Sequence, residues 1–382
     1  MKGVAILGAT GSIGRSALAV LDQHPDRFRA VALTAHRNGA ALAALAARYR
    51  PSLAVVADGE APSGVGGTTA WRTGREALLE AATHPDADIV LNALVGAAGL
   101  EPTLAALRAG KRVALANKES LVCGGPLVLE AAREGGGELV PVDSEHSAIL
   151  QCLQGSRPED VRRLVITASG GPFRGFSAEM LASVTPADAL RHPTWNMGAK
   201  ITIDSATLAN KALEVIEAHF LFGVGYDSIE AVVHPQSIIH SMVEMVDGSV
   251  LAQMGFPTME LPVLYAFGYP ERLPYACRRF DPVAAGTLTF EPVRSADFPA
   301  FALGVEAGKS GGTAPAVYNA ANEVAVQHFL AGRLPFAGIA GAIAQTLERC
   351  PAAAARSLHD VLEADARARR CAEDFVQRLA PC

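Results

Sequence analysis

The chain has 382 residues, of which 50% are hydrophobic and 19% are charged, with 36 glycines and 23 prolines. This composition is typical of a folded globular protein of two or three domains and excludes a disordered, collagen-like or coiled-coil chain. The 33 lysines and arginines against 39 aspartates and glutamates give a net charge of −6, without the basic surface that nucleic-acid binding requires. The expected partners are small molecules, and no nucleic acid.

The cysteines and the N-terminus indicate a cytoplasmic protein that neither spans nor crosses a membrane. No C-x-x-C motif or paired cysteine spacing occurs, so we expect neither a disulfide framework nor a zinc ribbon. The first apolar stretch ends at Leu7, too early for a signal peptide, and no later segment runs for ~18 residues without polar groups. The cysteines are Cys123, Cys152, Cys277, Cys350, Cys371 and Cys382.

The first 143 residues alternate short apolar runs with helical patterns. Such alternation predicts a parallel sheet with helices on both faces, in a doubly wound, Rossmann-like α/β domain. Ligands of such sheets bind beyond the carboxyl ends of the strands. The expected strands are Val4–Leu7, Ala30–Leu33, Leu53–Val56, Ile89–Leu94, Val113–Ala116 and Leu139–Val142, and the expected helices are Ser16–Gln23, Ala40–Arg50 and Pro102–Ala109.

The pattern changes after residue 143. A strand is expected at Leu164–Thr167, a helix at Ser205–Phe222, and a hairpin within Ile238–Met254, where Asp247-Gly248 separates two alternating runs. We therefore expect a central α+β catalytic domain over residues 144–270, a proline-rich linker over 271–300 and a C-terminal helical bundle over 301–382. The helical patterns of that bundle are Pro315–Leu330, Gly338–Cys350 and Leu358–Leu379.

A glycine-rich turn, Gly8-Ala-Thr-Gly11-Ser-Ile-Gly14, follows the first expected strand and opens a helix. In that context glycines let backbone amides approach a pyrophosphate, so the turn predicts dinucleotide binding; a purely structural tight turn is the alternative. The second strand ends without the acidic residue that usually binds the ribose of NAD. Arg37, with His36 and Asn38 beside it, suits a 2′-phosphate and favours NADPH, whereas a solvated surface arginine is the alternative.

Two polar clusters follow later strands of the expected sheet. Asn117-Lys118-Glu119 follows Val113–Ala116, and Asp143-Ser144-Glu145-His146 follows Leu139–Val142. Both lie at carboxyl ends, where an α/β sheet holds its ligands. Taken singly, Lys118 could be a surface charge at a helix start and Asp143 a helix cap.

A third polar group is expected on the helix that begins at Asp204 or Ser205. Asn210, Lys211 and Glu214 are four and three residues apart, so they share one helix face. A salt-bridged solvent face is the ordinary explanation. If this face meets Asp143 and Glu145, three carboxylates converge in a site for Mg²⁺ or Mn²⁺, not for zinc.

Two further segments have both a functional and a structural interpretation. The Ser169-Gly170-Gly171 turn and Ser205 offer hydroxyls beside free backbone amides, which suits a phosphate, although turn chemistry explains them almost as well. The loop from His192 to Gly198 carries Trp195 and is either a lid over a substrate or an anchored surface loop. His234 and His240 are ambiguous in the same way.

Together, and in one collinear order, these motifs resemble the 1-deoxy-D-xylulose 5-phosphate reductoisomerase family. The family makes 2-C-methyl-D-erythritol 4-phosphate for isoprenoid precursors, so the resemblance implies an NADPH-dependent and metal-dependent oxidoreductase that acts on a sugar phosphate as a homodimer. The matching segments are Gly8–Gly14, Asn117–Val122, Val142–His146, Ser169–Phe173, His192–Trp195, Ile203–Thr207, Asn210–Glu214, His234–Ser237 and Asn319–Val324.

The resemblance also implies a role for each matching residue. It implies Asp143, Glu145 and Glu214 as metal ligands. It implies Lys118, Glu145 and His192 as catalytic residues, in a substrate site made of Lys118, Ser144, Glu145, Ser169, His192, Ser205, Asn210, Lys211 and Glu214. The implied NADPH contacts are Thr10, Gly11, Ser12, Ile13, Arg37, Asn38, Asn117, Glu119 and Gly198, with Trp195 and Met197 on a closing flap.

The chain departs from the family pattern at His36, Thr194, Ala212 and Gly255–Pro262, which leaves the metal and phosphate groups untouched. Two other functions remain open at this point. A plain NADP-dependent dehydrogenase or a semialdehyde dehydrogenase would share the glycine-rich turn. The latter would need a nucleophilic cysteine, and Cys123 and Cys152 have no such signature around them. A non-catalytic NADP sensor would not need three carboxylates.

Overall fold

The computed structural model describes residues 1–63, 67–195, 197–276 and 278–379, which form two compact units. The first unit consists of Met1–Ser120, Pro126–Ser147 and Thr258–Cys277, and the second of Leu121–Gly125, Ala148–Pro257 and Arg278–Cys382. The expected division at residues 143, 270 and 300 stays a prediction. Cys277, Cys382 and Asn196 of the expected flap lie outside the described residues.

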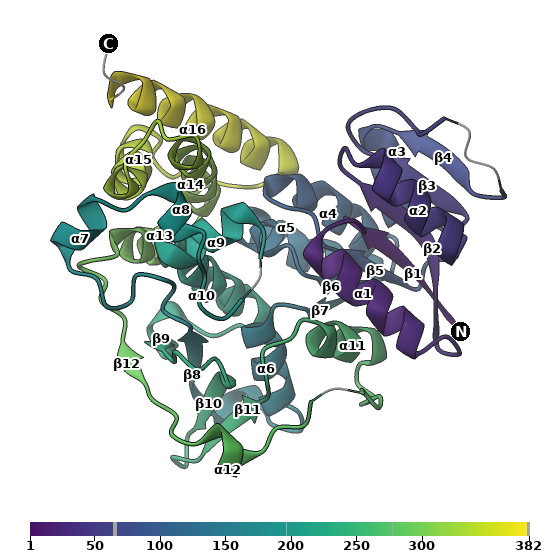
Figure 1. Cartoon of the computed structure of the whole chain (residues 1–382), viewed down its shortest axis with the longest axis horizontal. Coiled ribbons are helices and arrows are strands. Elements are labelled where there is room, and N and C mark those ends of the chain that lie inside the picture. Colours follow the sequence, from purple (N-terminus) through teal and green to yellow (C-terminus); the bar gives the residue numbers. More distant parts are fainter. Residues whose placement is uncertain (64–66, 196, 277, 380–382) are drawn as a thin grey trace. The chain divides into compact units, whose positions relative to one another are not determined.

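A seven-stranded parallel sheet forms the core of the first unit, in the order β4-β3-β2-β1-β5-β6-β7 (Figure 1). The order reverses between β1 and β5, and at such a switch point a doubly wound sheet opens a crevice for ligands. The sheet confirms the predicted Rossmann-like fold and all of its expected strands. The strands are β1 (Lys2–Leu7), β2 (Phe28–Ala35), β3 (Leu53–Val56), β4 (Ala70–Thr73), β5 (Ile89–Asn92), β6 (Arg112–Leu115) and β7 (Glu138–Pro141).

Amphipathic helices connect these strands and cover the sheet. Helix α1 packs with α11, and α3 packs with α4. The edge strand β4 was not expected, because its four residues are mostly exposed and carry no apolar run. The helices are α1 (Ser12–Gln23), α2 (Gly39–Tyr49), α3 (Arg75–Ala82), α4 (Leu100–Arg108), α5 (Lys118–Gly135), α6 (Ser144–Cys152) and α11 (Glu260–Gly268).

The second unit contains a mixed five-stranded sheet in the order β11-β10-β8-β9-β12. The predicted hairpin is confirmed: β10 and β11 pair antiparallel, and Gly248 in their turn has a φ of +87° that favours glycine. Strand β8 pairs parallel with β9 on its other side. The strands are β8 (Val161–Ala168), β9 (Ile229–Val233), β10 (Ile239–Met245), β11 (Val250–Met254) and β12 (Glu291–Pro292).

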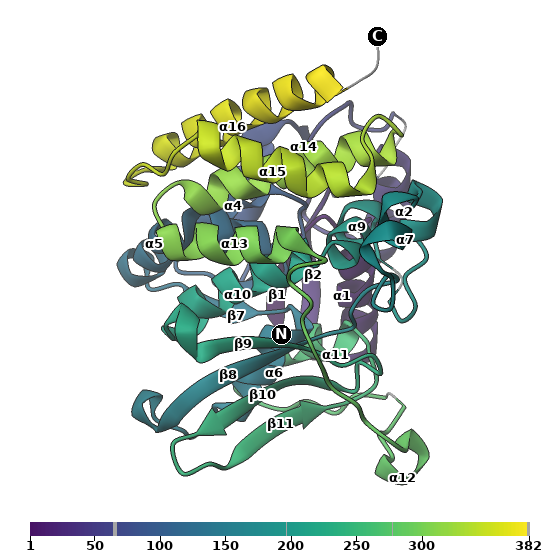
Figure 2. The ribbon, with the colours of Figure 1, turned by 90° about the vertical axis from the view of Figure 1, so that its left-hand side faces the viewer.

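Helices make up the rest of the second unit, and α14, α15 and α16 pack side by side as the expected C-terminal bundle (Figure 2). The residues expected as a linker, 271–300, hold the short elements α12 and β12. The helices are α7 (Ala178–Ala182), α8 (Pro186–Ala189), α9 (Ala199–Ala206), α10 (Ala209–Phe222), α12 (Pro282–Ala285), α13 (Pro299–Ser310), α14 (Ala314–Leu330), α15 (Phe336–Arg349) and α16 (Leu358–Leu379).

The single helix expected over Ser205–Phe222 is wrong. Two helices, α9 and α10, replace it, because Leu208 between them adopts a left-handed conformation with a φ of +58°. Leu208 is nevertheless buried in the same apolar cluster as Ile203 and Leu213, so the apolar pattern runs through the break unchanged. As a result, Ser205 lies in the last turn of α9 and not at a helix start.

Cys350 and Cys371 are free thiols. The sulfur atoms of Cys350 and Cys371 are 3.4 Å apart in hydrogen-bond contact, and burial together with this contact raises the pKa of Cys350 to about 11. Within the described residues, no helix is both long enough and apolar enough to cross a membrane.

The glycine-rich turn between β1 and α1 is closed by short backbone contacts. Gly8 has a φ of +89°, which a residue with a side chain rarely adopts. A Cβ atom on Gly14 would lie 2.4 Å from the carbonyl oxygen of Gly8, whereas one on Gly11 would lie 3.3 Å from it. Gly14 therefore lets α1 approach the turn, and Gly11 precedes the first residue of α1, Ser12.

Gly14→Ala should lower the free energy of unfolding by about 1–3 kcal/mol, because the new methyl group overlaps backbone atoms that cannot move aside. Gly11→Ala is the matched control. Its backbone φ of −77° suits alanine, so the change should stay within about 0.5 kcal/mol. Urea denaturation followed by circular dichroism measures both values, and equal losses in the two variants would contradict the predicted crowding at Gly14.

Candidate active site

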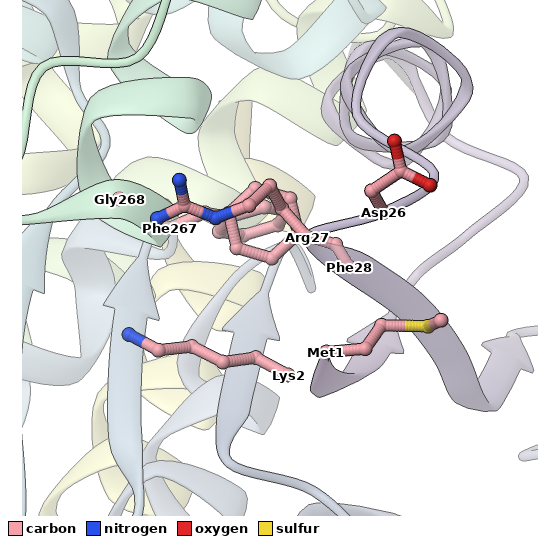
Figure 3. Close-up of a pocket in the computed structure, with 7 residues that line it drawn as sticks. All are labelled: Met1, Lys2, Asp26, Arg27, Phe28, Phe267 and Gly268. Carbon is pink, nitrogen blue, oxygen red and sulfur yellow. The ribbon is translucent and has the colours of Figure 1, made fainter.

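A pocket of about 220 Å³ lies at the amino ends of β1 and β2, beside the last residues of α11 (Figure 3). Figure 3 shows Lys2 and Arg27 with their nitrogen atoms on the same side of this pocket. Parallel sheets bind their ligands at the opposite, carboxyl ends of the strands. None of the site residues expected from the sequence lines this pocket, so the candidate site is at the other end of the sheet.

Lys118 and Asp143 meet at that carboxyl end, after β6 and β7 respectively. The Nζ atom of Lys118 lies 2.8 Å from Oδ2 of Asp143, and only 7% of the lysine side chain is exposed. Burial opposes ionisation of Asp143, but the nearby Lys118 and His146 outweigh it and hold the pKa of Asp143 well below its usual range. The solvated surface charge considered for Lys118 is therefore wrong.

The neighbours of this pair are held by their own side-chain hydrogen bonds. Ser144 donates its hydroxyl to Oε2 of Glu145 at 2.6 Å, at the start of α6. Asn117 caps α5 by accepting from the backbone amide of Ser120 at 2.9 Å, and its own amide group donates to Glu119 at 3.1 Å. Asn117 is thus tied into the protein, and its expected contact with NADPH stays a prediction.

In the second unit, Lys211 and Glu214 form a buried ion pair on α10. Lys211 also donates to the carbonyl oxygen of Thr167 at 2.5 Å, and Asn210 donates its side-chain amide to Glu214. Asn210, Lys211 and Glu214 therefore share one helix face, as predicted. Lys211 and Glu214 are 3% and 1% exposed, so the alternative of a solvent-exposed salt bridge is wrong.

His192 joins the two serines that were expected to bind phosphate. Its Nε2 atom lies 3.0 Å from Oγ of Ser169 and 3.1 Å from Oγ of Ser205. Ser169 belongs to the turn after β8, in which Gly170 and Gly171 have positive φ values and Gly171 donates its amide to Ser169. Three side chains from different segments thus converge, although Ser205 is not at the helix start that the sequence predicted.

The hydrogen bonds of His192 determine its protonation state. Its Nδ1 atom accepts from the backbone amides of Thr194 at 3.1 Å and Trp195 at 2.9 Å. A nitrogen that accepts has no proton, so the neutral ring carries its proton on Nε2. Burial also lowers the pKa of His192. The ring therefore directs an N–H donor, at Nε2, toward the hydroxyl groups of Ser169 and Ser205.

The residues expected near the cofactor lie at the ends of β1 and β2. Thr10, Gly11, Ser12 and Ile13 span the glycine-rich turn and the first residues of α1. Asn38 caps α2, and the exposed guanidinium of Arg37 pairs with Asp58, with 2.6 Å between Nε and Oδ2. The sequence analysis missed Asp58, because it follows β3 and only the end of β2 was searched for an acid.

The remaining expected residues belong to the flap, to the segment after β9 and to β10. Gly198 caps α9, and the ring centroids of Trp195 and His240 are 6.5 Å apart. His234 uses both ring nitrogens within the protein, with the carbonyl oxygen of Thr289 and the amide of Ile238. Its structural interpretation is therefore the correct one.

The lowered pKa of His192 gives the stability a defined pH dependence. Below the ordinary pKa of 6.5 the unfolded chain binds a proton at His192 that the folded chain resists, so acid should reduce the stabilisation that His192 provides. The difference in unfolding free energy between wild type and His192→Gln should therefore shrink from about pH 7.5 to about pH 5.5. The exposed His359, changed to Gln, serves as the control variant. A constant difference for His192→Gln would exclude this effect.

Comparison with known protein families covers nearly the whole chain. The model of 1-deoxy-D-xylulose 5-phosphate reductoisomerase matches residues 4–125. The model of its C-terminal domain matches residues 139–222, and a model called DXP reductoisomerase C-terminal domain matches residues 254–371.

Relatives and solved structures agree with these matches. Reductoisomerases of this name from Symbiobacterium thermophilum and Ralstonia nicotianae are each 53% identical to the chain, covering 99% and 98% of it and 100% and 98% of their own lengths. The structure of the Zymomonas mobilis enzyme in complex with NADPH is 46% identical, with a TM-score of 0.91 over 98% of this chain and 99% of that one. A reductoisomerase in complex with NADPH, fosmidomycin and magnesium is 39% identical, with a TM-score of 0.92 over 99% of both chains. The chain therefore belongs to the 1-deoxy-D-xylulose 5-phosphate reductoisomerase family.

Proposed function

We propose that the residues described above carry out the reaction of the family in this chain. That reaction converts 1-deoxy-D-xylulose 5-phosphate to 2-C-methyl-D-erythritol 4-phosphate and depends on NADPH and a metal ion. The observation that carries the function is the 53% identity along 99% of the chain. Incubation of the protein with the substrate, NADPH and Mn²⁺, followed by the absorbance of NADPH, tests it directly.

NADPH fits the switch point of the first sheet. The backbone amides at the start of α1 suit a pyrophosphate, and Gly14 keeps this turn tight without side-chain atoms. When bound, NADPH supplies the hydride for the reduction. We assign the pyrophosphate to Thr10, Gly11, Ser12 and Ile13, the 2′-phosphate to Arg37 and Asn38, and further NADPH contacts to Asn117, Glu119 and Gly198.

A divalent ion fits three acidic side chains of the chain. Asp143, Glu145 and Glu214 each offer a carboxylate oxygen and could hold a metal ion. Three such oxygens are the hard ligands that Mg²⁺ and Mn²⁺ prefer. When bound, the ion acts as a Lewis acid toward the oxygens of the substrate. Each of the three carboxylates also has a neighbour in the protein that holds it in place. Lys118 forms an ion pair with Asp143, and Ser144 donates to Glu145. Glu214 accepts from Asn210 and forms an ion pair with Lys211.

The protein side chains bind and orient the substrate. Ser169, Ser205 and the Nε2–H group of His192 provide converging donors that suit the phosphate group. The Nζ atom of Lys118 lies 2.8 Å from Asp143, and an ammonium group there suits negative charge that develops on the reacting oxygens. Trp195 and Met197 belong to a flap whose closure would exclude water.

We further propose a homodimer in the cytoplasm. The cytoplasmic location is supported by the thiols of Cys350 and Cys371, which form no disulfide although their sulfur atoms lie 3.4 Å apart, as is usual in a reducing compartment. The homodimer follows the resemblance to the family, and sedimentation of the purified protein tests it.

Arg37→Ala should reduce the preference for NADPH, because NADH lacks the phosphate that the guanidinium binds. A charged hydrogen bond contributes ~1.5–3 kcal/mol, so the NADPH/NADH ratio of kcat/KM should fall about tenfold or more. Asp58→Asn should keep or raise this ratio, since it removes the carboxylate that pairs with Arg37. Arg48 is the control, because it pairs with Asp22 on the surface and its change to Ala should leave the ratio unchanged. An unchanged ratio in Arg37→Ala would disprove the assignment.

Neutral variants of the three proposed metal ligands should show the same defect in their response to Mn²⁺. These variants are Asp143→Asn, Glu145→Gln and Glu214→Gln. Each variant should fold and bind NADPH but require at least about tenfold more Mn²⁺ for half activity, or lose turnover. The loss of activity in each double variant, expressed as a free energy, should be much smaller than the sum of the losses in the two single variants, because the carboxylates belong to one metal site. Titration calorimetry with Mn²⁺ measures binding independently of activity.

Glu138 is the matched control for this metal site, since it begins β7 at the end opposite Asp143 and is exposed. Glu138→Gln should respond to Mn²⁺ like the wild type. Full activity in EDTA, or a wild-type Mn²⁺ response in Glu214→Gln, would rule out the three-carboxylate site.

A further inference from the structure

A buried carboxylate lies directly beside the proposed phosphate site and has no role in the mechanism above. Asp204 precedes Ser205 in the last turn of α9, and its side chain is 1% exposed. One of its oxygens pairs with Lys200 at 2.9 Å, one turn earlier on the same helix. The other accepts a hydrogen bond of 2.8 Å from the side-chain amide of Asn322 on α14, which is fully buried.

Stability alone does not explain a buried carboxylate at position 204, because its burial costs free energy. Helices α9 and α14 otherwise meet through apolar side chains such as Ile203, Ala321 and Ala325, which belong to one core cluster. An apolar residue at position 204 would avoid the cost of removing a charged carboxylate from water, and buried ion pairs are often no better than apolar packing. Burial of Asp204 does, however, tie α9 to one orientation on α14, because an unpaired buried charge is strongly unfavourable.

The orientation of α9 decides where the hydroxyl of Ser205 lies. Neighbouring residues on a helix point about 100° apart, so a rotation that broke the contact between Asp204 and Asn322 would also turn Ser205 away. Ser205 lies 3.1 Å from Nε2 of His192, which in turn reaches Ser169. A small rotation of α9 would therefore separate the donors that converge in this site.

We propose that Asp204 and Asn322 form a positioning pair that fixes α9 on α14 and thereby holds Ser205 against His192 for binding the phosphate group of the substrate. This inference rests on the proposed assignment of Ser205 and His192 to that phosphate. It gives the C-terminal helix α14 a part in substrate binding, although α14 contributes none of the binding residues assigned above.

Asn322→Leu removes the hydrogen-bond donor but keeps a branched side chain. Asn322→Asp places a second carboxylate against that of Asp204. In both variants, KM for the substrate and the inhibition constant of inorganic phosphate should rise about tenfold, because misplaced binding groups lose much of their effect. KM for NADPH should rise less than the phosphate constant, because Gly198 is the only one of the assigned NADPH residues that adjoins α9. A purely structural role would instead lower the melting temperature and leave the phosphate constant unchanged.

The reciprocal exchange, Asp204→Asn with Asn322→Asp, is the rescue test. It restores an amide facing a carboxylate, so the phosphate constant should return to within about threefold of the wild type, unlike either single variant. Asn319→Ala is the matched control, because Asn319 is also fully buried on α14 but donates to Glu323 within the same helix. It should leave the phosphate constant unchanged even if stability falls.

Ser205→Ala separates the two ways in which the proposal can fail. If phosphate inhibits Ser205→Ala as it inhibits the wild type, the assignment of Ser205 to the phosphate is wrong. If Ser205→Ala weakens phosphate inhibition while both Asn322 variants behave like the wild type, the assignment stands and the positioning pair is refuted. The proposal is also refuted if the reciprocal exchange is as defective as the single variants.

Discussion

In each unit, a buried lysine neutralises one of the carboxylates that we propose as metal ligands. Lys118 pairs with Asp143 in the first unit, and Lys211 pairs with Glu214 in the second. Removing one partner from a buried pair leaves an uncompensated charge and typically costs about 3–5 kcal/mol. The strand and helix ends that carry these residues are therefore constrained to keep the lysine and the carboxylate together.

A second constraint holds functional side chains at the carboxyl ends of the strands of the first sheet. The crevice beyond parallel strands has backbone groups that must find partners, and the side chains around it satisfy them. Asn117 donates to the carbonyl oxygens of Leu94 and Gly96. In the second unit, Lys211 likewise donates to the carbonyl oxygen of Thr167, a residue of β8. Residues at such positions serve the fold and the chemistry at once, so their structural and functional roles do not exclude each other.

The proposed phosphate site is built differently, from neutral donors on separate segments. His192 reaches both serines through one nitrogen, while its other nitrogen is held by amides of the flap segment. A neutral ring with a fixed proton donates to an anion without the desolvation cost of a buried charge. The position of the flap backbone and the donor state of His192 are consequently linked.

The sequence by itself determined the features that depend on local order. Alternating apolar runs predicted the parallel sheet, and the period of the helix placed Asn210, Lys211 and Glu214 on one face. Parallel strands end at one edge, which is why the sequence predicts that the polar residues after β6 and β7 lie together.

Only the tertiary structure decided the contacts between distant segments. The left-handed Leu208 separates α9 from α10, yet the apolar pattern of the sequence shows no break there. Leu208 is buried in the same cluster as Ile203 before it and Leu213 after it. Asp58 reaches Arg37 from the next strand, and Asn322 reaches Asp204 across 118 positions of sequence. Such pairings depend on which helix faces pack together, and no periodicity or local propensity encodes that choice.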